Sequence, residues 1–96
     1  MIRAEPEFEW DERKSQRNLR ERGFDFEFAT RIFDGPLIEE EDRRRDYRER
    51  RLVATGEIEG GIFVVVYTLR GKRRRIISAR RAKRRERDDY RKAYPE

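Results

Sequence analysis

The spacing of hydrophobic residues along the chain changes near Pro36. Before this residue, apolar side chains recur at intervals of two to four, which is typical of one face of a helix. After it, they form short runs rich in β-branched and aromatic residues, such as residues 62–67, which are typical of strands. This change predicts an α+β fold with two helices within residues 11–33, an antiparallel sheet of about four strands over residues 37–81, and a C-terminal helix.

The first helix is predicted over residues 12–22. Asp11 is a suitable N-cap, because its carboxylate can accept the free backbone N–H groups of the first turn, and Gly23 is a suitable C-terminal stop. The helix is almost entirely polar, so we expect it to pack through a narrow stripe that includes Leu19. Residues 8–10, with two aromatic side chains in period two, predict a very short strand or an extended lead-in.

A second helix is predicted over about residues 26–33, with Asp25 as its N-cap. Its apolar side chains, and that of Phe24 just before it, are expected in the core. The full set is Phe24, Phe26, Phe28, Ala29, Ile32 and Phe33. The Asp34-Gly35-Pro36 sequence ends this helix.

The predicted strands are separated by glycine-containing turns. They cover residues 37–42, 51–56, 62–69 and 73–81, and residues 43–46 are expected to form a charged turn or mobile loop. The short turns predict an antiparallel meander. No helix breaker occurs from Lys83 to Ala93, and the spacing of Glu86 and Tyr90 predicts the last helix there.

The 96 residues are enough for one domain with a single modest core, which we place at residues 1–96. Although 49% of the residues are charged and only 34% are hydrophobic, the hydrophobic ones are clustered, which favours a folded chain over a disordered one. No apolar stretch approaches the roughly 20 residues of a membrane helix, and the first residues do not resemble a signal peptide. We therefore expect a cytoplasmic protein without a membrane partner. The chain has no Cys or His, so we expect no disulfide, no thiol nucleophile, no metal site and no cofactor.

Basic residues concentrate in the C-terminal half. Residues 1–46 carry 10 basic and 14 acidic side chains, whereas residues 47–96 carry 16 and 7. Of the 26 basic residues 22 are Arg, whose planar guanidinium matches phosphate and stacks on bases better than the ammonium group of Lys. This distribution predicts a polyanion-binding surface, with RNA as the expected ligand. The alternative is a solvated surface whose arginines reflect genome composition.

The arginines of residues 73–81 are assigned to the two faces of a strand by strict alternation. One face is expected to carry Arg74, Ile76, Ser78 and Arg80, and the other Arg73, Arg75, Ile77, Ala79 and Arg81. Because a strand with a buried apolar row holds its side chains rigidly, Arg80 and Arg81 are the leading candidates for phosphate binding. The alternative is that they form ion pairs with the acidic N-terminal half.

Further candidates lie at the ends of the neighbouring strands. Tyr67 and Thr68 are expected to face the same pocket, where Tyr67 would stack on a base or transfer a proton. The alternative role of Tyr67 is that of an aromatic residue at the edge of the core. Arg50 and Arg51 open another strand, and Glu49 beside them is the nearest carboxylate for a general base.

Several short motifs are similar to those of a known family. They are Phe8-Glu9-Trp10-Asp11, Lys14, Asn18-Leu19, Gly23, Phe26, Ala29, Phe33-Asp34, Pro36, Arg50-Arg51, Gly56, Val65-Val66-Tyr67-Thr68, the run from Arg75 to Ala82, Glu86 and Tyr90. These residues resemble the BrnT family of bacterial toxins over residues 8–90, and the Arg-Ile-Ile-Ser-Ala-Arg segment is especially specific. The resemblance implies a RelE-like fold and a ribonuclease activity that blocks translation. It also implies a BrnA-like antitoxin that binds the toxin in a hetero-oligomer and represses the operon, so that operator DNA is reached through the antitoxin.

The chain departs from this family pattern at one position. Many relatives carry His immediately before the glycine equivalent to Gly23, whereas this chain carries Arg22. We expect Arg22 to act at the helix end, because a cation in the last turn is stabilised by the helix dipole.

The resemblance implies metal-independent RNA cleavage, which guanidinium groups can promote by stabilising the charge of the pentacoordinate phosphorane. The expected catalytic residues are Arg80 and Arg51 for this charge, with Glu49 or Tyr67 for proton transfer. The expected RNA-binding residues are Arg50, Arg75, Ser78, Arg81 and Lys14.

Two other functions fit the same sequence. One is a non-catalytic nucleic-acid-binding protein in which the same arginines hold phosphates. Residues 83–92 contain no Asn, Gln or Ser for reading base edges, so backbone binding is favoured. The other is a structural subunit of a regulatory complex, whose basic face docks an acidic protein.

Overall fold

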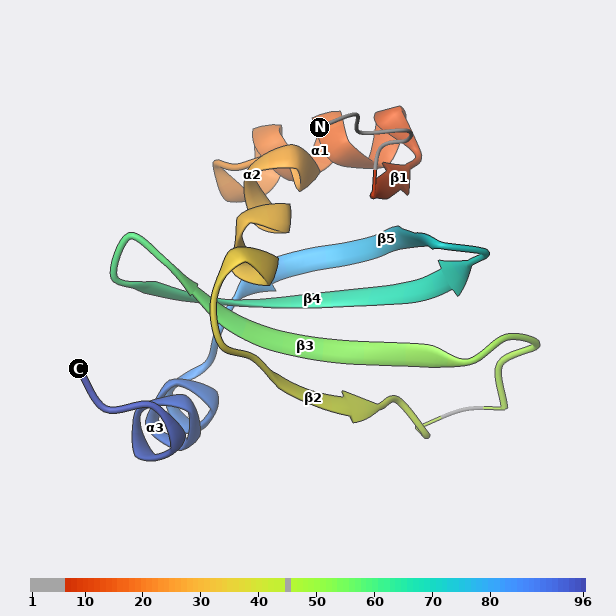
Figure 1. Cartoon of the computed structure of the whole chain (residues 1–96). Helices are drawn as coiled ribbons and strands as arrows, with labels where there is room; N and C mark the ends of the chain where they lie inside the picture. Colours follow the sequence, from red (N-terminus) through yellow and green to blue (C-terminus); the bar gives the residue numbers. More distant parts are fainter. Residues whose placement is uncertain (1–6, 45) are drawn as a thin grey trace, which may run out of the picture.

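A five-stranded sheet forms the centre of the fold (Figure 1). The computed structural model describes residues 7–44 and 46–96, so Arg45 of the predicted charged loop lies outside the described residues. The strands are β1 (Phe8–Trp10), β2 (Ile38–Glu41), β3 (Arg51–Ile58), β4 (Gly61–Arg70) and β5 (Arg73–Arg81). The helical segments are α1 (Glu12–Arg22), α2 (Phe26–Ala29), the 3-10 helix η1 (Thr30–Asp34) and α3 (Arg84–Ala93). The predicted α+β class is confirmed, and in the described part of the chain no helix has the length and apolar character needed to cross a membrane.

The sheet is mixed and has the order β1-β5-β4-β3-β2. β2 to β5 form the predicted antiparallel meander. The fifth strand is β1, which pairs in parallel with β5 from Phe8↔Arg74 to Trp10↔Ile76. The antiparallel sheet predicted over residues 37–81 and the short strand predicted at residues 8–10 are confirmed, but the sheet has five strands and not about four. The parallel pairing of β1 was not predicted, because a three-residue alternation does not reveal a partner strand far along the chain.

α1 begins and ends where the sequence predicted. Asp11 accepts a hydrogen bond from the backbone N–H of Arg13 at 2.8 Å, which satisfies one donor of the first turn. Gly23 adopts the left-handed conformation with φ 87°, and its N–H donates to the carbonyl of Leu19 at 3.0 Å.

The buried side of α1 is polar. The prediction that Leu19 is buried is wrong, since 43% of this residue is exposed. Ser15 and Asn18 are buried instead: the hydroxyl of Ser15 accepts the N–H of Phe26, and the amide of Asn18 donates to the carbonyl of Phe24, both at 2.9 Å. These hydrogen bonds attach α1 to the segment that follows it, in place of an apolar stripe.

The predicted second helix is divided. Asp25 caps α2 by accepting the N–H of Phe28 at 2.8 Å, as expected. After one turn the chain continues as η1, so a single helix over residues 26–33 is wrong. At the junction the hydroxyl of Thr30 donates to the carbonyl of Glu27, three residues earlier, which suits the tighter winding of a 3-10 helix.

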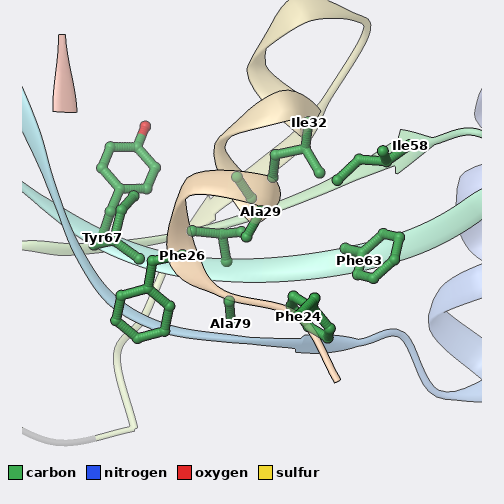
Figure 2. Packing of buried hydrophobic residues seen from close by; sticks show 11 residues of the cluster. Phe24, Phe26, Ala29, Ile32, Ile58, Phe63, Tyr67 and Ala79 are labelled. Carbon is green, nitrogen blue, oxygen red and sulfur yellow. The ribbon is translucent and has the colours of Figure 1, made fainter. Parts of the chain in front are cut away.

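The main core lies between the helical layer and one face of the sheet. Phe24, Phe26, Ala29 and Ile32 from α2, η1 and the residues before them pack against Phe63, Val65, Ile76 and Ala79 from β4 and β5 (Figure 2). All eight side chains are buried, with at most 5% of each residue exposed. The predicted core positions of the second helix are confirmed, with Phe28 and Phe33 partly buried at the margin.

α3 lies on the opposite face, near the turn between β3 and β4 (Figure 1). Tyr90 is buried there with Ile62, Val64 and Ala82. Its hydroxyl donates to the carbonyl of Pro36 at 2.8 Å, which satisfies the one polar atom of the ring. This small second core covers only part of the face.

A bulge in β5 changes the faces that its side chains occupy. Val66 pairs with Ser78, but the next residue, Tyr67, pairs with Ile76, so Ile77 is an extra residue in β5. The side chains before and after Ile77 therefore do not follow one alternation.

The observed faces follow from this bulge. Arg74, Ile76, Ala79 and Arg81 lie on the face covered by α2 and η1, whereas Arg73, Arg75, Ser78 and Arg80 lie on the other face. The prediction that Arg74 and Ile76 share a face with Ser78 and Arg80 is wrong, because strict alternation takes no account of an extra residue.

We expect Gly56→Ala to lower the free energy of unfolding by about 1–3 kcal/mol, because overpacking a core forces its neighbours to move. A Cβ on Gly56 would lie 2.7 Å from the Cβ of Ile32 and 3.2 Å from its carbonyl oxygen, where η1 crosses β3. Urea unfolding measures the change. Gly35→Ala is the matched control, since no atom lies within 4 Å of its added Cβ and its φ is −131°; equal effects of the two substitutions would contradict this account.

Candidate functional site

The face of the sheet opposite α1 and α2 carries an open groove beside the first turn of α3. We call it the Arg80 groove; its volume is about 490 Å³. Its floor is formed by Val53, Val64 and Val66, which come from β3 and β4. Four arginines and four carboxylates line it together with Ser78. The groove therefore combines an apolar floor with walls of balanced charge.

Arg80 is the central cation of this groove. Its guanidinium forms a bidentate ion pair with Glu86 of α3, with both N–O distances at 2.8 Å. The side chains are about one-third exposed, at 35% and 32%. The hydrogen bond from Arg80 lowers the pKa of Glu86 to about 2, and the same bond raises the pKa of Arg80. Arg80 is thus paired, but with the C-terminal helix and not with the acidic N-terminal half.

Glu86 also holds the start of α3. Its carboxylate accepts the backbone N–H of Lys83, the N-cap residue, at 2.7 Å. This is one of the two hydrogen bonds of a capping box. A ligand that displaces Glu86 from Arg80 therefore removes one partner of the carboxylate that caps the first turn of α3.

Arg22 is a residue of the groove that the sequence analysis assigned only to a helix end. It does lie in the last turn of α1, as expected. Its Nη1 also donates to the carbonyl of Ala79 at 2.7 Å and to the side chain of Asn18 at 3.4 Å. This places a guanidinium beside Ser78 at the edge of β5. The signal in the sequence was the departure from the family pattern at this position.

Arg51, Arg50 and Glu49 lie together in another groove, of about 410 Å³, lined by residues 41–43 and 46–51. The guanidinium carbon of Arg51 lies 4.0 Å from the centre of the Tyr47 ring, and its buried Nε has no hydrogen-bond partner among the described residues. Arg50 pairs with Glu41 at 3.4 Å, and Glu49 with Arg70 at 3.6 Å. The structure does not bring Glu49, Arg50 or Arg51 into the Arg80 groove.

Tyr67 and Thr68 point to opposite faces, so the expectation that they share a pocket is wrong. Neighbouring residues of a strand alternate between faces. Thr68 donates to the carbonyl of Arg50 at 2.7 Å. Tyr67 belongs to the main core, and its hydroxyl donates to the carboxylate of Glu39. Burial and this hydrogen bond raise the pKa of Tyr67.

Arg74, beside Tyr67, was not singled out by the sequence analysis. Its guanidinium lies among three aromatic rings, 4.5 Å from the centre of Phe33, 5.7 Å from Tyr67 and 5.9 Å from Phe8. Such contacts between a cation and ring faces hold the side chain in place. Arg74 thus closes the edge of the core between β1 and η1.

The other predicted RNA-binding residues are dispersed. Arg75 lies on the face of Arg80 but is held by Glu9 of β1 at 2.9 Å. Arg81 lies on the opposite face, with its guanidinium 4.9 Å from the centre of the Phe63 ring. Lys14 lies in a third groove, of about 270 Å³, between α1 and β5. Ser78 is therefore the predicted residue that the structure places with Arg80.

The acidic segment of β2 forms one wall of the Arg80 groove. Glu40, Glu41 and Asp42 line it. Asp42 is buried and accepts two hydrogen bonds from Arg44 at 2.9 Å, which lower its pKa below the ordinary value. Among residues 7–44 and 46–96, no three acidic side chains are grouped so as to hold a metal ion.

The family model described as the ribonuclease toxin BrnT of type II toxin–antitoxin systems matches residues 10–86. This match covers α1 to the first turn of α3 and includes Arg22, Ser78, Arg80 and Glu86. No curated protein matches the chain.

The Glu86 ion pair makes a pH dependence testable. Because folding lowers the pKa of Glu86 from 4.5 to about 2, the carboxylate stabilises the fold above pH 4.5, and this contribution is lost as the pH falls towards 2. We expect Glu86→Gln to lower the free energy of unfolding at pH 7 by no more than about 1 kcal/mol, since the pair is partly screened by solvent. The variant should lose less stability than the wild type between pH 4.5 and 2.

Urea unfolding across this pH range measures both effects. Asp88→Asn is the matched control, because Asp88 is exposed on α3 and has no ion pair among the described residues. A wild-type decline no steeper than that of Glu86→Gln would contradict the role given to the pair.

Proposed function

The chain belongs to the BrnT family of ribonuclease toxins of type II toxin–antitoxin systems, and we propose that it is a metal-independent endoribonuclease that cleaves cellular RNA and so inhibits translation. We further propose that it acts in the cytoplasm and that its fold is RelE-like. The observation that carries the catalytic proposal is the Arg80 groove, in which a guanidinium fork lies beside a serine hydroxyl and a second guanidinium.

The chemistry of RNA cleavage fits this arrangement. The 2′-oxygen of a ribose attacks the adjacent phosphorus, the bond from phosphorus to the 5′-oxygen breaks, and the proton of the 2′-hydroxyl is lost to a base while the 5′-oxygen gains one. Negative charge builds on the two non-bridging oxygens, which match the planar fork of Arg80. Arg22 and Ser78 would bind the same or the next phosphate. Arg80 must exchange Glu86 for the phosphate in this step.

Cleavage also needs groups that transfer protons. Glu49 and Tyr67 remain the candidates from the sequence, but Glu49 lies in the groove of Arg51 and the Tyr67 hydroxyl is bonded to Glu39. Arg51, Arg50, Arg75, Arg81 and Lys14 would then contribute to binding a longer strand outside the Arg80 groove. Arg51 would then contact a flanking phosphate and not, as expected from the sequence, the scissile phosphate.

We propose that a BrnA-like antitoxin covers the open face of the sheet in a hetero-oligomer and that operator DNA is bound through the antitoxin. The valine floor and the mixed charges of the Arg80 groove suit a protein segment. This proposal predicts that a co-expressed antitoxin co-purifies at physiological salt and relieves growth arrest. Val66→Asp, which places a charge on the partly buried floor, should weaken the complex by about 1 kcal/mol or more in a titration. An antitoxin that neither co-purifies nor relieves arrest would contradict the pairing.

We expect Arg80→Ala to lower the rate of RNA cleavage by about 10²–10³-fold, the usual effect of removing one transition-state donor. Growth arrest on induction should disappear, while antitoxin binding remains. The partly exposed ion pair with Glu86 should cost no more than about 1 kcal/mol of stability when it is lost. Arg80→Lys is the stricter variant, because it keeps the charge but loses the fork and should remain largely inactive.

Labelled RNA incubated with purified protein, with and without EDTA, provides the measurement. Intact RNA in a stable complex would favour the non-catalytic nucleic-acid-binding protein, and induction without growth arrest would favour the structural subunit. Cleavage by Arg80→Ala at the wild-type rate would remove Arg80 from the site.

A further inference from the structure

The Arg80 groove continues over the edge of the sheet onto α1. β1 pairs with β5 only as far as Ile76, and within residues 7–44 and 46–96 no strand continues along this edge of β5 from Ile77 onward. α1 lies there instead, and between the two elements is the groove of about 270 Å³, which we call the α1 groove. Arg22 and Ser78 line both grooves. The two grooves therefore meet at these residues.

The α1 groove carries a row of cations on one side of the helix. Lys14, Arg17 and Arg22 line it, with Glu21 as the one carboxylate among its lining residues. Residues three and four apart on a helix lie on the same side, so Lys14, Asn18 and Arg22, at intervals of four, share this wall with Arg17 and Glu21. From Lys14 to Arg22 the helix rises by about 12 Å, which lies between the lengths of three and four stacked nucleotide steps of about 3.4 Å each.

These cations differ from those of the Arg80 groove in their partners. Arg80 is paired with Glu86 at 2.8 Å and Arg44 with Asp42 at 2.9 Å. Among residues 7–44 and 46–96, neither Lys14 nor Arg17 forms an ion pair, and Arg22 bonds only to the neutral oxygens of Ala79 and Asn18. The α1 groove thus has a surplus of positive charge, whereas the Arg80 groove has four basic and four acidic side chains.

We propose that the α1 groove is a binding site for the phosphates of single-stranded RNA that flank the scissile bond, with Lys14 and Arg17 as its contacts. In this arrangement the strand passes along α1, crosses the sheet edge at Arg22 and Ser78, and presents its scissile phosphate to Arg80. The inference rests on the proposed ribonuclease function and names the part of the strand that the cleavage chemistry does not use.

The site suits the backbone of RNA and not its bases. The amide nitrogen of Asn18 donates to the carbonyl of Phe24 and its oxygen accepts from Arg22, so both polar atoms already have partners. Phe26 also lines the groove, but only 2% of it is exposed, which leaves no ring face for stacking. Binding should therefore be independent of sequence and sensitive to salt.

The test compares a double variant with a control of equal charge. Lys14→Gln/Arg17→Gln removes two cations from the groove, and Arg13→Gln/Arg20→Gln removes two from exposed positions of α1 that line neither groove. The probes are fluorescent 2′-O-methyl oligonucleotides of three and ten nucleotides, which cannot be cleaved because the attacking oxygen is blocked. Anisotropy titrations at several salt concentrations give Kd and its salt dependence.

For the longer probe, we expect the Lys14→Gln/Arg17→Gln variant to bind about 10-fold more weakly near physiological salt, with a salt slope smaller by about 1.4, since each phosphate contact on a single strand contributes about 0.7. The shorter probe reaches only one of the two grooves, so the wild type should bind it more weakly than the longer probe. The control pair should change either Kd by less than about twofold, because exposed charges off the path act only through the screened field.

In cleavage of unmodified RNA, KM should rise and kcat should stay constant. Arg17→Gln alone should give a smaller shift in the same direction. Because Arg17 is exposed, this single variant should fold normally and therefore controls for misfolding of the double variant.

The proposal is overturned if the control pair weakens binding equally, if the wild type binds the shorter probe as tightly as the longer one, or if the groove variant loses affinity for the antitoxin while its RNA binding is unchanged. If wild-type protein binds and cleaves RNA but the groove variant is indistinguishable from it, this inference fails and the ribonuclease proposal stands. If wild-type protein neither binds nor cleaves RNA, both fail.

Discussion

The extra residue at Ile77 decides which side chains of β5 reach each face of the sheet. Ile76 and Ala79 are both buried against the helical layer, although an odd spacing of three would place them on opposite faces of a regular strand. Because the bulge absorbs one residue, Ser78 and Arg80 emerge on the open face. Without it, Arg80 would lie on the face of Ile76, beneath α2, and the groove would lose its central cation. The functional surface therefore depends on an irregularity of the sheet.

The second constraint is that the arginines of the groove are largely neutralised. An RNA phosphate bound at Arg80, as we propose, would replace Glu86, so one charge-assisted pair would be exchanged for another, and the net gain would be smaller than for a free guanidinium. Affinity for a polyanion must then come mainly from cations without carboxylate partners. In the described residues beside this groove, Lys14, Arg17 and Arg22 meet that condition, which supports the proposed path over α1.

Local signals in the sequence predicted most of the elements. The caps Asp11 and Gly23 gave the bounds of α1, and the glycine turns gave the meander, because these features act within a few residues. The parallel pairing of β1, the bulge at Ile77 and the polar docking of α1 were missed, since each depends on contacts between distant segments. The same limit applies to the site: Ser78 and Arg80 were grouped correctly, but the partner of Arg80 and the reach of Arg22 required the packed structure.

Arg22 contributes both to the packing of α1 on the sheet and to the charge of the two grooves. Its hydrogen bond to the carbonyl of Ala79 ties the end of α1 to β5 directly after the bulge, so the walls of the two grooves are held relative to each other. The contact uses one N–H of the guanidinium on a neutral acceptor, which leaves the charge and other donors for a ligand. A histidine at this position would change its charge near neutral pH, whereas a guanidinium stays charged. At the junction of the proposed path, one side chain therefore provides both a structural contact and a cationic group.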